Sequence, residues 1–270
     1  NGTAMDLANY YDLVTEGFLY SPSCRVTLLD TGTGSQGKTL SMTAVKMYED
    51  PLVFHSVFDI EGKKVGYLVF TSFTLDCIDG LIDICDSFET AGVSELILDL
   101  RYNGGGYVLT EEVLASMLAP ARNVAAEDVF EQEIYNKALS GYYVETYGED
   151  ALNSRFKTSF SQTEGIIPMT WDTKYCNLDL DRLYAIIDSG TASASESILV
   201  GLMPYLPVTL IGQQSHGKFC SGILYGAQEW YDDYKDQLES KIYDSRKYVD
   251  DWGIYVMIGR YADCNGNCPA

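Results

Sequence analysis

The chain has 270 residues, of which 46% are hydrophobic and 21% are charged, so it can bury one large core and carry a small attached module. Its 39 acidic and 18 basic residues give a formal charge of −21, whose field repels phosphate backbones, and we therefore expect no nucleic-acid partner. No apolar run is long enough to cross a membrane, and no basic segment followed by an apolar one opens the chain. The sequence predicts neither a membrane span nor a signal peptide within it.

The cysteines argue against a structural metal. There are seven, without a Cys-x-x-Cys pair, and the chain has only two histidines, so we expect no zinc site. Cys77 and Cys85 fall in a predicted helix and are interpreted as buried small hydrophobic residues. Cys264 and Cys268 flank a turn that a disulfide could close in an oxidising compartment, but an odd number leaves at least one thiol unpaired. The cysteines do not decide whether the protein works in an oxidising or a reducing compartment.

The first segment, residues 1–48, is expected to form a small module. Helix-like spacing from Leu7 to Val14 is followed by a strand over 25–29, a glycine-rich turn, and a second strand over 39–45 that predicts a hairpin. This segment is too small to bury a core alone. Either it packs on the rest of the chain, or its first half lies upstream of residue 1.

From residue 49 onward, strands and helices alternate. Strands are predicted over 53–60, 65–70, 96–100, 183–187, 208–211 and 254–259, with helices over 75–91, 109–118 and 193–205. The span from about 129 to 175 is rich in tyrosine and less regular. This alternation predicts an α/β core over residues 49–270.

Three motifs could carry chemistry. The first is the strand 98–100, which runs into Gly104, Gly105 and Gly106. This motif could bind an anion, because glycines allow a positive φ and leave N–H groups uncovered. A phosphate loop is excluded by the missing Gly-Lys-Ser/Thr, but an ordinary tight turn remains an alternative.

The second motif is a run of small residues, 188–196, that joins a strand to an apolar helix. A serine there lies at a helix N-terminus, where free N–H groups and the helix dipole favour developing negative charge. The alternative is a simple helix cap.

The third motif, residues 212–218, ends in Gly217-Lys218. Most lysines are solvated, but a buried one releases its proton more readily and can act as a base, so the burial of Lys218 decides this interpretation. His216 suggests a serine–histidine pair, yet we favour a loop histidine without a catalytic role, and the same for His55. The chain has no Gly-x-Ser-x-Gly elbow, which argues against an α/β-hydrolase.

Taken together and in this order, the motifs resemble the C-terminal processing (tail-specific) serine peptidases. The matching residues are Val65-Gly66-Tyr67-Leu68, Asp99-Leu100-Arg101 with Gly105-Gly106, Thr191-Ala192-Ser193-Ala194-Ser195-Glu196 and Gly217-Lys218. The resemblance implies the spiral ββα fold shared with the crotonase and Clp peptidase superfamily. It implies Ser193 as nucleophile and Lys218 as base, since the family lysine follows the serine by the same separation. It requires no metal or cofactor.

The same resemblance suggests further properties. Residues 1–48 look like the back half of a PDZ domain, which would bind the substrate's C-terminal segment as an added strand. The N–H groups of Ala194 and Gly105 would hold the oxyanion, and the substrate would be a protein or peptide. Bacterial relatives mostly work outside the cytoplasm, which predicts a periplasmic or other extracytoplasmic location after removal of an upstream signal.

One residue departs from the family pattern. A glutamine thought to orient the lysine is expected four residues after it, where this chain has Gly222. Ser221 or a backbone carbonyl could replace it. Gly222 and the incomplete PDZ-like region support one alternative, a non-catalytic peptide- or ligand-binding protein of the same fold. A second alternative is an acyl-CoA enzyme of the crotonase type, which would have no use for Lys218.

Overall fold

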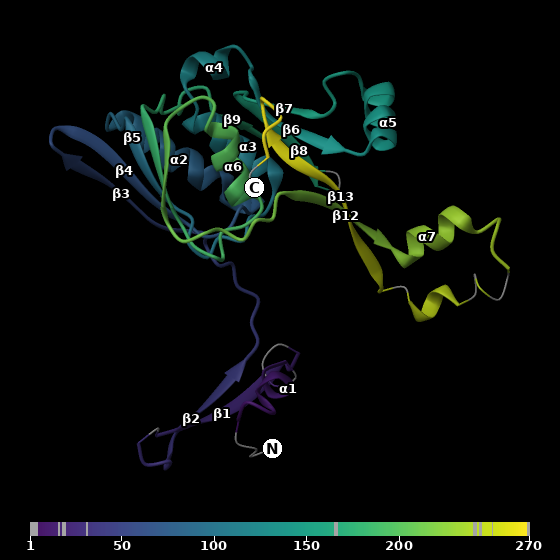
Figure 1. Cartoon of the computed structure of the whole chain (residues 1–270). Helices are drawn as coiled ribbons and strands as arrows, with labels where there is room; N and C mark the ends of the chain where they lie inside the picture. Colours follow the sequence, from purple (N-terminus) through teal and green to yellow (C-terminus); the bar gives the residue numbers. More distant parts are fainter. Residues whose placement is uncertain are drawn as a thin grey trace. The chain divides into compact units, whose positions relative to one another are not determined.

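The computed structural model describes residues 5–15, 17, 20–30, 32–164, 167–239, 242, 245–249 and 251–268. The chain divides into two compact units, Asn1–Glu49 and Asp50–Ala270 (Figure 1). The assignment of the first unit to a PDZ domain stays a prediction.

The first unit holds one short helix and one hairpin. Helix α1 spans Tyr10–Val14, and strands β1 (Ser23–Leu29) and β2 (Gln36–Thr43) pair antiparallel. The Asp30 carboxylate shapes the turn because its Oδ1 accepts the N–H groups of Gly32 and Thr33 at 3.0 and 2.7 Å. No described residue of this unit is buried, so the described residues form no hydrophobic core there.

A five-stranded sheet forms the centre of the second unit. Its order is β11-β10-β5-β4-β3, with β3 antiparallel to β4 and the other pairs parallel. The strands span Leu52–Ile60 (β3), Lys63–Phe70 (β4), Glu95–Asp99 (β5), Arg182–Ile187 (β10) and Val208–Gly212 (β11). Parallel strands direct their carboxyl ends to one edge, which is where the motif loops begin.

Helices bury the core beside this sheet. Helix η2 (Leu75–Cys77), α2 (Ile78–Thr90), α3 (Val108–Leu118), α4 (Ala121–Ala125) and α6 (Ala194–Leu202) contribute to a single cluster of buried apolar side chains, and Figure 1 shows α3 and α6 close together. Cys77 and Cys85 are buried in it as predicted. The predicted α/β core is therefore confirmed.

A second, antiparallel sheet has the order β12-β13-β6-β7. Its strands span Cys220–Gly226 (β12), Gly253–Asp263 (β13), Val129–Tyr135 (β6) and Asn153–Arg155 (β7). Strands β12 and β13 extend away from the body, and helix α7 (Ala227–Tyr234) lies at the far end with the short helix η3 (Arg246–Tyr248) (Figure 1).

The tyrosine-rich span is more regular than the sequence indicates. Besides β6 and β7, it contains helix α5 (Lys137–Tyr147) and a hairpin of β8 (Ser159–Glu164) and β9 (Ile167–Asp172). Within the described ranges, no helix is both long and apolar enough to cross a membrane.

Candidate active site

The glycine loop after β5 is organised by Asn103, which is completely buried. Its Nδ2 donates to the Phe70 carbonyl at 2.9 Å, and its Oδ1 accepts the Gly105 N–H at 2.9 Å. Gly105 has φ +94°, a conformation that side-chain-bearing residues rarely adopt. The loop is thus held to the end of β4 by one amide side chain.

Ser193 lies on a strained turn. Its φ and ψ are 59° and −123°, it occupies the N-cap of α6, and it is half-buried. Positive φ in a residue other than glycine persists only where the surroundings enforce it, and such strain is common at functional sites. Ser195, in contrast, is completely buried, and its Oγ donates to the Asn103 carbonyl at 3.0 Å. Of the two serines, only Ser193 is partly exposed.

The two loops touch at Gly105. A Cβ placed on Gly105 would lie 2.7 Å from the Ser193 Cβ and 2.9 Å from the Ala194 nitrogen, which real contacts do not allow. The Ala194 N–H donates to no group among the described residues. The Gly105 N–H is engaged by Asn103, so of the two oxyanion donors predicted, one is open and one is occupied.

Glu196 joins the serine turn to the lysine loop. Its carboxylate is buried, and its Oε2 accepts the N–H groups of Ser193 at 3.0 Å and of Lys218 at 2.8 Å. Its Oε1 accepts the Gly217 N–H at 2.6 Å. Because two backbone nitrogens converge on one oxygen atom, the backbones of Ser193 and Lys218 lie side by side.

The importance of Glu196 was missed at the level of sequence. A signal for it was present, because Ser193 followed three residues later by a glutamate before an apolar helix is the pattern of a capping box. In this structure the glutamate binds the Ser193 N–H, as in such a box, and also a distant loop.

Lys218 itself is half-buried. No hydrogen bond joins its Nζ to the Ser193 Oγ, and no ion pair involves it in the part of the chain that the structure describes. Gly222, which occupies the place of the family glutamine, packs against a ring, since a Cβ there would lie 2.8 Å from Tyr255. The Ser221 hydroxyl is buried and does not bond to Lys218. The residue that orients this lysine is not supplied from either position.

Neither histidine takes part in this arrangement. His216 is exposed, and its backbone N–H donates to the Thr191 carbonyl at 2.9 Å. His55 lies on β3, with its ring edge against Phe88. The seven cysteines are free thiols, and the described residues contain no cluster of three metal-binding side chains.

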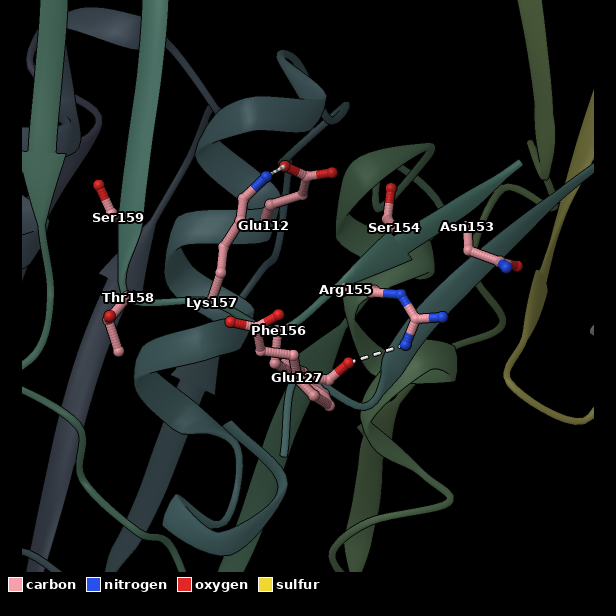
Figure 2. Close-up of a pocket in the computed structure, with 9 residues that line it drawn as sticks. All are labelled: Glu112, Glu127, Asn153, Ser154, Arg155, Phe156, Lys157, Thr158 and Ser159. Atoms are coloured by element: carbon pink, nitrogen blue, oxygen red, sulfur yellow. Dashed lines mark hydrogen bonds and ion pairs between the residues drawn. The ribbon is translucent and has the colours of Figure 1, made fainter. Parts of the chain in front are cut away.

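A cavity of about 450 Å³ lies elsewhere, lined by Glu112 of α3, by Glu127, and by β7 with the segment that follows it (Figure 2). Figure 2 shows Lys157 reaching Glu112, with Nζ and Oε2 3.2 Å apart, and Arg155 donating to the Glu127 carbonyl. None of its nine lining residues belongs to the three motif loops. The cavity is therefore separate from the candidate active site.

Comparisons with known proteins identify a family and similar folds. The model of "Peptidase family S41" matches residues 64–269. A crystal structure of a proposed S41 protease from Bacteroides fragilis NCTC 9343 is 20% identical, covers 99% of this chain and 60% of that one, and superimposes with a TM-score of 0.62. The photosystem II D1 C-terminal processing protease is 18% identical, covers 90% of this chain and 51% of that one, and has a TM-score of 0.51.

This chain thus spans little more than half the length of these two proteins, and the likeness to them concerns the fold. The family match covers most of the chain, including the glycine loop, the strained serine and the lysine loop. The chain belongs to peptidase family S41.

Proposed function

We propose that this chain is the catalytic core of a serine endopeptidase that cleaves protein or peptide substrates near their C-termini, with Ser193 as nucleophile and Lys218 as general base. The observation that carries the proposal is the Glu196 carboxylate, which binds the backbones of both residues. The C-terminal site of cleavage is suggested by the name of the D1 processing protease.

In the proposed mechanism, neutral Lys218 accepts the proton of the Ser193 hydroxyl as the oxygen attacks the scissile carbonyl. The C–N bond then breaks, and the lysine ammonium returns the proton to the leaving amine. Water hydrolyses the acyl-enzyme by the same exchange in reverse. No metal or cofactor is needed.

The oxyanion would be held by the N–H groups of Ala194 and Gly105, each worth about 3 kcal/mol in comparable sites. The Ala194 N–H is open, whereas the Gly105 N–H would have to leave Asn103 Oδ1 when substrate binds. The strained Ser193 backbone keeps the Ala194 N–H next to the hydroxyl.

The proposal is tested with a fluorophosphonate label and an unfolded protein substrate. Ser193→Ala is expected to abolish both labelling and cleavage, and Lys218→Ala to abolish cleavage, whereas Ser195→Ala is the matched control that keeps the nucleophile. Cleavage retained by either dyad variant would refute the dyad. The cleavage rate is also expected to rise with pH as the lysine loses its proton, and a flat profile would argue against Lys218 as base.

The alternative is a binding protein of the same fold without turnover. Two observations favour this alternative: no hydrogen bond joins the side chains of Ser193 and Lys218 in the described structure, and the Tyr255 ring packs against Gly222. It predicts peptide binding without fluorophosphonate labelling. An extracytoplasmic location and tail capture by residues 1–48 belong to our proposal for the whole protein.

A further inference from the structure

Two glutamates are buried side by side in the core of the second unit, away from the site described above. Glu111 of α3 is 2% exposed and Glu131 of β6 is 3% exposed. Both lie next to α6, the helix that begins at Ser193, because Ser197 one turn into this helix donates its hydroxyl to the Glu131 Oε1. Isolated buried carboxylates are strongly unfavourable, so this pair requires an explanation.

The contacts are consistent with one proton between the two groups. Glu131 accepts a hydrogen bond from the Ser197 hydroxyl, whereas the buried Glu111 Oε1 has no hydrogen-bond partner among the described residues, and a proton on Glu111 would allow it to donate to Glu131. If both were ionised, Glu111 Oε1 would be a buried acceptor without a donor. Among the described residues, no lysine or arginine forms an ion pair with either glutamate.

Among the described residues, no cation contacts either glutamate directly. Glu112 faces the pair from α3 and is paired with Lys157 at 3.2 Å, Glu133 and Tyr135 of β6 bind each other at 2.6 Å, and Tyr261 faces the pair from β13. Burial raises the pKa of Glu111 well above its ordinary value, with the Glu131 charge adding to it. Burial also raises the pKa of Glu131, to about 7.

We propose that Glu111 and Glu131 share a proton and that this pair is a positioning device, which fixes α6 and so the Ser193 turn and releases them when the proton is lost. The part that concerns Ser193 rests on the proposed function. Loss of the proton would place two charges in contact inside the core, and separation of α3 from β6 and α6 would relieve the repulsion.

The pH dependence follows from the raised pKa values. In the folded protein the pair keeps a proton that the unfolded chain releases near the ordinary glutamate pKa of 4.5. The stability that the pair contributes is therefore complete below that pH and is lost as the pH rises through the folded values.

The experiment compares the wild-type chain with Glu111→Gln, whose amide can donate to Glu131 without a titratable proton. The matched control is Glu89→Gln, which removes the same charge from an exposed position of α2. The melting midpoint of each protein is measured at about pH 6 and at about pH 9. The drop in melting midpoint between the two should be about 5 °C larger for the wild type and the control than for Glu111→Gln. Equal losses in all three would overturn the proposal.

Infrared spectroscopy of the wild type tests the proton without any variant. A C=O stretch of a protonated carboxyl group is expected at pH 7, where exposed carboxyl groups are ionised, and it should vanish at alkaline pH. Its absence at pH 7 would also overturn the proposal.

The link to the active site is measured by the rate of fluorophosphonate labelling of Ser193. Above about pH 8 the wild type is expected to be labelled about ten-fold more slowly than Glu111→Gln at the same pH, on top of the rise that deprotonation of Lys218 gives both proteins. The same pH profile in both would remove the positioning role. A failure of the proposed function is distinguishable, because the wild type would then not be labelled at any pH while the melting and infrared results would be unaffected.

Discussion

At Gly105 the absence of a side chain is a requirement of the site. A methyl group there would meet the Ser193 Cβ at 2.7 Å and the Ala192 carbonyl oxygen at 2.8 Å, and the positive φ adds strain. We predict that Gly105→Ala lowers the rate of Ser193 labelling by about 100-fold or more, because small displacements of reacting groups have effects of this size.

The neighbouring glycine provides the control for this prediction. Gly104 is exposed, and a methyl group there would meet nothing within 4 Å. In the Gly104→Ala variant, Ser193 should therefore be labelled at a rate close to that of the wild type. Equal rates for the two alanine variants would show that the two loops do not need this close contact.

The Glu196 carboxylate is expected to matter for both stability and activity. Glu196→Gln keeps the shape of the side chain but turns one accepting oxygen into a donor that faces backbone N–H groups. We expect a loss of stability of about 1–3 kcal/mol and a loss of about 100-fold in peptide cleavage. Chemical denaturation and the initial rate of cleavage measure the two effects.

Glu229 is the matched control, since its Oε2 accepts the Gly226 N–H at 3.0 Å at the exposed start of α7. Glu229→Gln should change stability by less than about 1 kcal/mol and leave cleavage unchanged. If both glutamine variants kept full activity, Glu196 would be only a helix cap.

At the scale of elements, helix α6 packs closely on the second sheet. Gly201 faces Phe130 of β6, and a Cβ on Gly201 would lie 2.8 Å from the Phe130 Cδ2. We predict that Gly201→Ala destabilises the fold by about 1–3 kcal/mol through overpacking, although alanine favours helices. The midpoint of urea denaturation measures this.

Gly141 in α5 is exposed and has open space around it. Gly141→Ala should therefore stabilise the protein by up to about 1 kcal/mol. The two substitutions are chemically the same and are expected to have opposite signs. Destabilisation of equal size at both positions would contradict the role of the Phe130 contact.

Elements with strong apolar patterns were predictable, and those at the surface were not. The strand expected at 96–100 is β5 (Glu95–Asp99), and the helix expected at 193–205 is α6 (Ala194–Leu202), because each buries nearly all of its residues. Strand β7 and helix α5 contain no buried residue, so their sequences lack the periodicity that a core imposes.

The candidate site follows the same division. Ser193, Gly105 and Lys218 were predicted through the resemblance of the three motifs, in their order along the chain, to a known family, and their catalytic roles stay a prediction. The hydrogen bond between Asn103 and Gly105 and the clamp by Glu196 depend on loops distant in sequence, and no local pattern specifies which loops meet.

At the scale of the whole molecule, the two units differ in how they are stabilised. Every buried residue in the described part of the chain lies in Asp50–Ala270, and none lies in the first unit. The division falls just before β3, whose preceding residue Pro51 accepts the Thr71 N–H at 3.0 Å. A break before Asp50 would thus leave the bonds of the central sheet intact.

We therefore predict that a fragment of residues 50–270 folds by itself. Because it keeps the whole core, its melting midpoint should lie within about 3 °C of that of the full chain, and Ser193 should be labelled at an unchanged rate. Differential scanning calorimetry and labelling of both proteins measure these two properties. A fragment that melts without cooperativity, or that loses labelling while the full chain retains it, would show that residues 1–49 are part of the catalytic fold.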